Sequence, residues 1–280
     1  MSTRQTRAHI DTFRVPGASL HYEVRGSGPT LLLITGGPAD ADGYAQLATL
    51  LADRYTVVTY DTRGNSRSEP DDRSLDVSVP LLANDALHLI DAISGDEPAF
   101  VFGNSGGATT GLDLLIRYPH RVRKLVAHEP PLIELLPDAP EHRAQGDAIH
   151  ARFLNAGVGP AMAMFLAGAG LGDHNDGAPQ PAPSPEAQAW MARMQRTLEF
   201  FLGHYLRPVT NYLPDLARVP TEQLVVAVGE SSGDQLAART ARALADCLHL
   251  AAATVPDDHG GPMMQAEAFA PRLHALLCAV

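Results

Sequence analysis

A serine between glycines, after an apolar run and before a run of small residues, constrains this sequence most. Residues 103–107 read Gly-Asn-Ser-Gly-Gly; residues 99–102 are apolar, and residues 108–118 suit a helix. In such a strand–turn–helix arrangement the turn forces the serine into a strained backbone conformation, with its hydroxyl exposed over the edge of the sheet. Glycine at both flanks removes Cβ atoms that would collide there. The pattern predicts Ser105 as a nucleophile, provided that a histidine and an acid lie close to it in the fold.

The overall composition excludes several classes of partner. The 280 residues carry a formal net charge of −11, which argues against nucleic acid and an anionic membrane surface. Residues 1–10 are polar and resemble no secretory signal, and no run approaches the roughly 18 apolar residues of a membrane span. Cys247 and Cys278 fall among apolar residues in helical segments, so we expect two buried free thiols and no disulfide. A cytoplasmic protein is expected.

Strand and helix patterns alternate along most of the chain. A hairpin is predicted at 12–24, around the turn pair Pro16-Gly17. Continuous apolar runs, typical of parallel strands covered on both faces, lie at 31–34, 55–60, 99–102, 125–127, 224–228 and, more weakly, 253–255. Helical patterns between them lie at 44–51, 79–93, 108–118, 235–248 and 266–277. The alternation predicts an α/β fold with a doubly wound, mostly parallel sheet.

The alternation stops between residues 133 and 219. This segment has helical patterns only, and its part 172–185 is rich in Gly, Pro and Asp, as is typical of a mobile loop. Ligand sites in open α/β sheets lie at the carboxyl ends of the strands and need a covering element. We therefore expect a core of residues 1–132 and 220–280 with an inserted helical cap at 133–219. The alternative is that these helices simply extend the core.

Ser105 is preferred over two serines in similar contexts. Ser66 lacks the closing glycine, and Ser231 lies too late in the chain to be followed by an acid and a histidine in that order. His259 is the best candidate for the base, because it lies in a loop between the last predicted strand and the last helix. His128 is the other candidate near a strand end, but it is the final residue of its strand and directly precedes Glu129. A neutral imidazole there can take the Ser105 proton and return it later.

Two glutamates compete for the acid, whose role is to accept the second imidazole N–H and fix the tautomer. The usual place for it follows strand 224–228, where this chain has Ser232, which carries no charge. Glu230 lies two residues away from that position. Glu129 instead ends strand 125–127 in the sequence His-Glu-Pro-Pro, beside the strand of the nucleophile, and can reach a histidine from there. We favour Glu129 and keep Glu230 as the main alternative.

Two backbone amides are expected to stabilise the negative charge that develops on the attacked carbonyl oxygen. One belongs to Gly106, the residue after the nucleophile. The other comes from the loop after strand 31–34, where Gly36 or Gly37 can donate. Each such donor typically contributes ~2.7–4 kcal/mol to transition-state stabilisation.

The helical segment also offers large apolar side chains to a pocket, namely Met162, Met164, Phe165, Trp190, Met191, Phe200, Phe201 and Tyr205. At helical spacing many of these belong to a core, so only some are expected to touch a ligand. We select Met164, Phe165, Trp190 and Phe201 as the pocket lining.

The ordered set of motifs resembles the α/β-hydrolase superfamily over nearly the full length. The matching stretches are 31–38, 60–68, 103–107, 228–230 and His259. Within the superfamily the chain is most similar to zearalenone-type lactonases, which share the serine elbow, a His-Glu-x-Pro sequence after the next strand and a late loop histidine. The resemblance implies Glu129 as the acid, Gly36 and Gly106 as oxyanion amides, and a cap tryptophan at the pocket, for which Trp190 is the candidate.

Several positions separate the chain from other members of the superfamily. Thr35 stands where the superfamily commonly has His, and Ala39 where proline iminopeptidases carry a further glycine, which weakens an aminopeptidase assignment. A serine nucleophile in place of aspartate speaks against epoxide hydrolase and haloalkane dehalogenase chemistry.

The sequence thus predicts a serine hydrolase that cleaves an ester or lactone bond of an apolar small molecule through an acyl-enzyme. No cofactor and no metal are expected, since the ligand-rich residues 173–176 lie in a polar loop and no phosphate-binding glycine loop is present. The alternatives are a cofactor-independent C–C bond hydrolase, a proline iminopeptidase-like peptidase and a non-catalytic receptor for a small molecule. A homodimer is left open.

Overall fold

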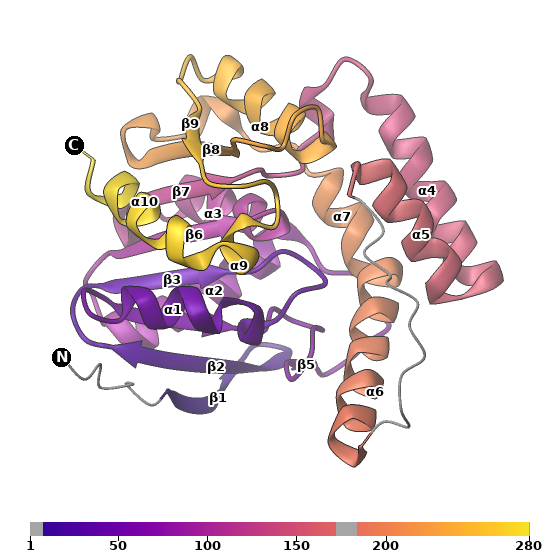
Figure 1. The fold of residues 1–280 in the computed structure, drawn as a ribbon, viewed down its shortest axis with the longest axis horizontal. Coiled ribbons are helices and arrows are strands. Elements are labelled where there is room, and N and C mark those ends of the chain that lie inside the picture. Colours follow the sequence, from indigo (N-terminus) through magenta and orange to yellow (C-terminus); the bar gives the residue numbers. More distant parts are fainter. Residues whose placement is uncertain (1–7, 172–183, 280) are drawn as a thin grey trace.

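The computed structural model describes residues 8–171 and 184–279 and has a central sheet with helices on both faces (Figure 1). Its strands are β1 (His9–Val15), β2 (Ala18–Gly26), β3 (Thr30–Ile34), β4 (Thr56–Tyr60), β5 (Glu69–Pro70), β6 (Ala99–Asn104), β7 (Val122–His128), β8 (Leu224–Gly229) and β9 (Ala253–Val255). They are ordered β1-β2-β4-β3-β6-β7-β8-β9, with β5 paired to β2. The pairings from β4 to β9 across the sheet are parallel, and those of β2 are antiparallel. The predicted doubly wound, mostly parallel α/β fold is confirmed.

The apolar sequence explains these strands. All residues of β3 and β6 are buried, as expected for strands that are covered by helices on both faces. The hairpin of β1 and β2 is closed by the pair Val15 and Ala18 around a two-residue turn. Gly17 in that turn has a φ of 77°, which a glycine adopts without steric cost.

Two layers of helices cover the sheet. On one face lie α1 (Ala45–Leu51), α9 (Gly261–Met264) and α10 (Ala266–Cys278), which share an apolar cluster with Phe102. On the other lie α2 (Val79–Ser94), α3 (Gly106–Arg117) and α8 (Leu236–Cys247), which pack around Val101. Short 3-10 turns connect the elements at η1 (Ala41–Tyr44), η2 (Pro119–Arg121), η3 (Ile133–Leu135), η5 (Leu216–Arg218) and η6 (Thr221–Gln223).

The described part of segment 133–219 is helical. It contains α4 (Ala139–Ala156), α5 (Val158–Ala169), α6 (Pro185–Phe200), one π-helical turn η4 (Phe201–Tyr205) and α7 (Leu206–Thr210), which lie together on one side of the sheet layers (Figure 1). Their apolar cluster includes Ile149 and Leu206 and also Leu82 of α2, so these helices pack onto the rest of the fold. Most of the loop expected at 172–185 lies outside the described residues.

The expectation of buried thiols is wrong. Cys247 and Cys278 are both free and exposed. Each is the last residue of its helix, and the buried stripe ends before it, at Ala245 in α8 and at Leu277 in α10. Apolar neighbours in the sequence therefore do not determine which residues of a final helical turn face solvent.

Buried ion pairs hold the segment that follows β4. Asp61 is fully buried and accepts hydrogen bonds from the amide of Ala41 at 2.8 Å and from Nε of Arg67 at 2.7 Å. Arg63 donates two hydrogen bonds to the carboxylate of Asp85 in α2, at 2.8 and 2.7 Å. Charge-assisted pairs of this geometry are strong when buried. They tie the loop after β3 and the helix α2 to the end of β4.

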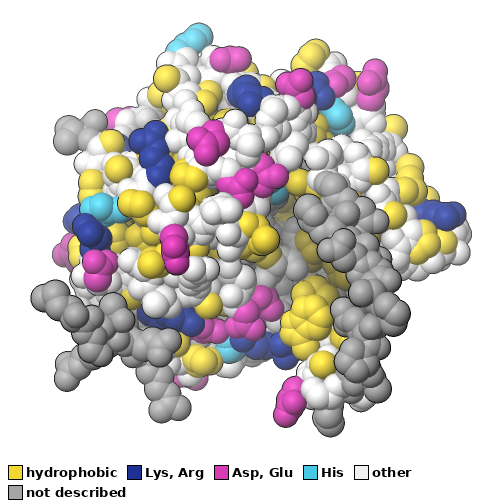
Figure 2. Space-filling model, viewed as in Figure 1, with side chains coloured by type: hydrophobic (Ala, Val, Ile, Leu, Met, Phe, Trp, Pro, Cys, Tyr) yellow, Lys and Arg dark blue, Asp and Glu magenta, His cyan; other side chains and the backbone are white. Residues whose placement is uncertain are grey.

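The surface gives two further facts. Within residues 8–171 and 184–279, no helix combines the length and the apolar character needed to cross a membrane. On the face drawn in Figure 2, acidic and basic side chains are interspersed and the basic ones form no continuous area.

Among the described residues, His128 is the histidine that lies in the core. His128, the last residue of β7, has no exposed surface and packs its ring against Phe102 and Phe269, with ring centroids 6.4 and 5.7 Å apart. Neither ring nitrogen has a hydrogen-bond partner. Burial lowers the pKa of His128 to about 4, against the opposing effect of the neighbouring carboxylate of Glu129. The imidazole is therefore neutral at pH 7.

A neutral buried histidine makes stability depend on pH. Between pH 6.5 and 4 the unfolded chain binds a proton at His128 that the folded chain excludes, so stability falls as the pH falls through this range. Because the pKa of Glu129 is lowered rather than raised, that carboxylate loses its own contribution only below about pH 4.5. We expect His128→Leu to remove roughly 2–3 kcal/mol of the stability difference between pH 7 and 4.5. Urea unfolding of the wild type and of His128→Leu at pH 7 and 4.5 measures this difference. If the free energy of unfolding changes by the same amount between the two pH values in both proteins, this role of His128 is contradicted.

Candidate active site

Ser105 lies on the strained turn that joins β6 to α3. Its φ of 56° and ψ of −126° are unfavourable for a residue with a side chain. The turn is held by a hydrogen bond from the Ser105 amide to the carbonyl of His128 at 2.9 Å. A methyl group added to Gly103 would lie 2.3 Å from the carbonyl oxygen of Gly107, and one added to Gly107 would lie 2.2 Å from that of Ile34. Backbone alone fits at both positions, which explains the glycines of the motif.

Both segments that are expected to supply backbone amides for the oxyanion lie against Ser105. Gly106 is the first residue of α3, where backbone N–H groups lack partners within the helix and carry a partial positive charge. A methyl group on Gly36 would lie 2.6 Å from Cβ and 3.2 Å from Oγ of Ser105. One on Gly37 would lie 2.9 Å from the ring of Phe201 and 3.0 Å from that of Tyr205. The loop after β3 is thus enclosed between the serine and the helical segment.

Glu129 follows β7 and has no exposed surface. Its Oε2 lies 2.7 Å from Nδ1 of His259, and its Oε1 accepts hydrogen bonds from the amide of Gly229 at 2.9 Å and from the hydroxyl of Ser232 at 2.5 Å. Burial alone would raise the pKa of this carboxyl, but the hydrogen bond from His259, the charges nearby and the Ser232 hydroxyl together lower it to about 2. The group is therefore a carboxylate at pH 7. The backbone of Glu129 has a φ of 50°, a conformation that residues with side chains rarely adopt.

Glu230, the alternative acid, does not reach the histidine. It is exposed, and its contact is a 3.4 Å hydrogen bond from the amide of Asp257. Ser232 stands at the usual position of the acid after β8, and its hydroxyl donates a hydrogen bond to the carboxylate of Glu129. The side chain of Glu129, directly after β7, therefore contacts the loop after β8.

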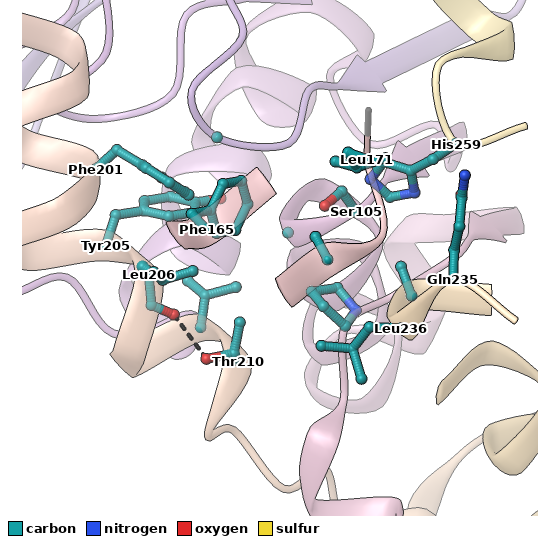
Figure 3. Close-up of a pocket in the computed structure, with 16 residues that line it drawn as sticks. Ser105, Phe165, Leu171, Phe201, Tyr205, Leu206, Thr210, Gln235, Leu236 and His259 are labelled. Carbon is teal, nitrogen blue, oxygen red and sulfur yellow. Dashed lines mark hydrogen bonds between the residues drawn. The ribbon is translucent and has the colours of Figure 1, made fainter. Parts of the chain in front are cut away.

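His259 is held by the loop between β9 and α9. Asp257 in that loop has a φ of 65°, its carbonyl accepts from the amide of Ser231 at 3.0 Å, and Asn104 donates to the carbonyl of His259 at 3.3 Å. Nδ1 of His259 contacts Glu129, so Nε2 is the ring nitrogen available to groups in the cavity. Ser105 and His259 both line this cavity (Figure 3). Among the described residues the Ser105 hydroxyl and the His259 ring form no hydrogen bond, although both line this cavity. Catalytic hydrogen bonds of this kind often tighten only in the complex with substrate.

This cavity measures about 580 Å³, including its open mouth. Apolar side chains form most of its walls, and the polar groups among its described lining are few. The lining residues are Gly37, Ser105, Gly106, Pro131, Phe165, Ala169, Leu171, Phe201, Tyr205, Leu206, Val209, Thr210, Gln235, Leu236, Ala237 and His259. The described residues include no group of three or more His, Cys, Asp or Glu side chains that could hold a metal ion.

Of the four side chains expected at the pocket, the structure places two in the described lining of the cavity and two outside it. Phe165 and Phe201 line the cavity and contact each other edge to face, with centroids 5.1 Å apart. Trp190 is 49% and Met164 is 37% exposed, and neither is part of the lining. Trp190 lies on the solvent side of α6, whereas the π-helical turn after α6 presents Phe201 and Tyr205 to the cavity.

Other lining residues were missed or not selected. Gln235 and Leu236 come from the start of α8, a core helix, and nothing in the helical pattern of 235–248 distinguishes them. Tyr205 was one of several large side chains in the helical segment. Its position just before Leu206 and Val209, both of which also line the cavity, is a periodic signal that could have selected this face.

The chain is similar to known proteins in sequence and in fold. The family model described as alpha/beta hydrolase fold matches residues 29–201. The uncharacterised hydrolase YraK of Bacillus subtilis is 32% identical over 273 residues, which cover 95% of each chain. A zearalenone hydrolase of Bionectria ochroleuca is 32% identical over 130 residues, 45% of this chain and 48% of that protein. The crystal structure of a hydrolase from Pseudomonas aeruginosa PA01 superposes with a TM-score of 0.73 at 23% identity, over 96% of this chain and 98% of that one.

The family model spans more than half of the chain, and the Bacillus relative matches it almost from end to end. The likeness to the Pseudomonas structure supports the same fold. We conclude that the chain is a hydrolase of the α/β-hydrolase family.

Proposed function

We propose that this hydrolase is a serine esterase or lactonase, with Ser105 as nucleophile, His259 as base and Glu129 as the acid of the triad. The observation that carries the proposal is the 2.7 Å contact between the buried carboxylate of Glu129 and Nδ1 of His259, in a cavity that His259 shares with Ser105. Such a carboxylate fixes the imidazole tautomer and stabilises the imidazolium that forms during attack.

The reaction follows from these positions. The Ser105 oxygen bonds to the carbonyl carbon while its proton passes to His259, and the carbonyl π electrons move onto oxygen. Backbone N–H groups of Gly106 and of Gly36 or Gly37 stabilise that oxyanion. The tetrahedral intermediate then expels the alcohol, which takes the proton from His259, and leaves an acyl-enzyme. Water, deprotonated by His259, repeats the addition, and Ser105 leaves with the returned proton.

The walls of the cavity favour an apolar substrate. Phe165, Phe201 and Leu206 supply apolar surface, and small-molecule sites are typically lined in this way, by hydrophobic and aromatic side chains with a few polar groups. The partial match to zearalenone hydrolases supports a lactone or ester of this kind. We also propose that residues 133–219 act as a cap over a core of residues 1–132 and 220–280, because α5, η4 and α7 contribute walls to the cavity of Ser105.

Removing the nucleophile tests the proposal. Ser105→Ala should lower kcat for p-nitrophenyl butyrate by at least about 10⁴-fold, since no other hydroxyl takes its place. Ser231→Ala, in the second Gly-x-Ser-x-Gly sequence, is the matched control and should retain wild-type turnover. Undiminished activity in Ser105→Ala would reject the mechanism. A single burst of nitrophenol from the wild type without turnover would instead indicate a receptor on this fold.

The two glutamates give a second test. Glu129→Gln should lower kcat by about 10³–10⁴-fold, because the amide cannot stabilise the imidazolium and permits the wrong tautomer. Glu230→Gln should leave kcat unchanged, because that side chain is exposed and contacts only a loop amide. Steady-state kinetics on an ester and a lactone measures both, with thermal unfolding to establish that each variant is folded. The reverse pattern, an active Glu129→Gln and an inactive Glu230→Gln, would overturn the assignment.

A further inference from the structure

One buried hydroxyl in the cavity wall has no partner. Tyr205 is 2% exposed, and its hydroxyl oxygen forms no hydrogen bond in the described structure. Leaving a buried polar group unpaired costs about 1–3 kcal/mol, and such groups are rare in native proteins. Because Tyr205 lines the same cavity as Ser105, a ligand in that cavity is the partner within reach.

The hydroxyl of Tyr205 lies beside the predicted oxyanion amides. A methyl group added to Gly106 would be 2.6 Å from this hydroxyl oxygen, and one added to Gly37 would be 3.0 Å from the edge of the same ring. The phenol therefore occupies the space next to both glycines, and the absence of side chains at these positions makes room for it. Figure 3 shows the ring extending from its helix toward the part of the cavity that holds Ser105.

The local structure fixes this position. Tyr205 is the last residue of the π-helical turn η4, a type of turn that often occurs at functional sites. Its ring packs against that of Phe201, with centroids 6.0 Å apart, and against the loop of Gly37. The hydroxyl is thus held in place before any substrate arrives, which is the property that makes a donor effective in a transition state.

We propose that the Tyr205 hydroxyl is a third oxyanion donor, which acts together with the amide of Gly106 and an amide of the Gly36-Gly37 loop. The inference rests on the proposed function. As Ser105 adds to the carbonyl carbon, the π electron pair moves onto the carbonyl oxygen, and Tyr205 donates a hydrogen bond to it. The phenol keeps its proton throughout, and the hydrogen bond weakens when the carbonyl forms again.

The electrostatic environment suits a donor. Burial raises the pKa of Tyr205 above its ordinary value, so the hydroxyl remains protonated across the pH range in which such an enzyme works. A hydrogen bond to a developing negative charge in a water-excluded site is worth more than one to a neutral carbonyl. The donor therefore favours the transition state over the bound substrate.

The test is Tyr205→Phe, which removes the hydroxyl and keeps the ring. The control is Tyr60→Phe, because Tyr60 is also fully buried with an unpartnered hydroxyl and interacts electrostatically with Tyr205, but does not line the cavity. It shows whether a change near Tyr205 alone lowers activity. Tyr205→Phe should lower kcat roughly 100-fold, the lower end of the loss for one oxyanion donor, with KM little changed. Its melting temperature should be unchanged or higher, because no hydrogen bond is lost. Tyr60→Phe should retain wild-type kcat.

A comparison of two substrates separates oxyanion donation by Tyr205 from contact with the leaving alcohol and from substrate binding. The loss of kcat in Tyr205→Phe should be equal for p-nitrophenyl butyrate and methyl butyrate, because both form the same oxyanion. A loss confined to methyl butyrate would assign the hydroxyl to the leaving alcohol, and a change in KM alone would assign it to substrate binding; either overturns the inference. So does a kcat within a few fold of wild type. If Ser105→Ala is inactive and Tyr205→Phe is fully active, only this inference fails; activity in Ser105→Ala removes the proposed function as well.

Discussion

The carboxylate of Glu129 is the interaction on which the arrangement of this site depends. A fully buried charge is unfavourable unless every lone pair that water would have satisfied finds another partner. Here the partners come from three segments: the backbone of Gly229 at the end of β8, the hydroxyl of Ser232 in the next loop, and the imidazole of His259 after β9. The same hydrogen bonds that stabilise the charge therefore fix the histidine. Removing any one donor leaves a buried charge short of a partner.

The strain in the site follows the same geometry. Ser105, Glu129 and Asp257 all have positive φ, and each lies just beyond the carboxyl end of a strand, after β6, β7 and β9. Parallel pairing brings these ends to one edge of the sheet. The surrounding hydrogen bonds hold the unfavourable conformations, as is common where side chains must be aimed at a ligand. The cavity above them is mostly apolar, and its few unpartnered polar groups, such as the Tyr205 hydroxyl, are positioned before a ligand binds.

Sequence patterns predicted the fold, and the structure brings Glu129 and His259 together at the sheet edge, as expected. Helical spacing did not indicate which face of each helix meets the cavity. The turn of Ser105 needs glycines at fixed positions, so it is visible in one dimension. Glu129 is harder to find from the sequence, because Ser232 stands at the usual position of the acid. Only the folded sheet shows that the Ser232 hydroxyl donates a hydrogen bond to the carboxylate of Glu129. Trp190 is the tryptophan of segment 133–219, yet helical periodicity does not indicate which face of α6 meets the sheet. The π-helical turn then changes the register, so that Phe201 and Tyr205 face the cavity.

In the proposed mechanism Ser105 carries the acyl group, in a site organised by Glu129 and His259. Rapid acid quench of the enzyme with p-nitrophenyl butyrate, followed by proteolysis and mass spectrometry of the peptides, tests it most directly. The butyryl group is expected on the peptide that contains Ser105. An acyl group on Ser66 or Ser231, or steady hydrolysis with no acylated serine, would contradict it.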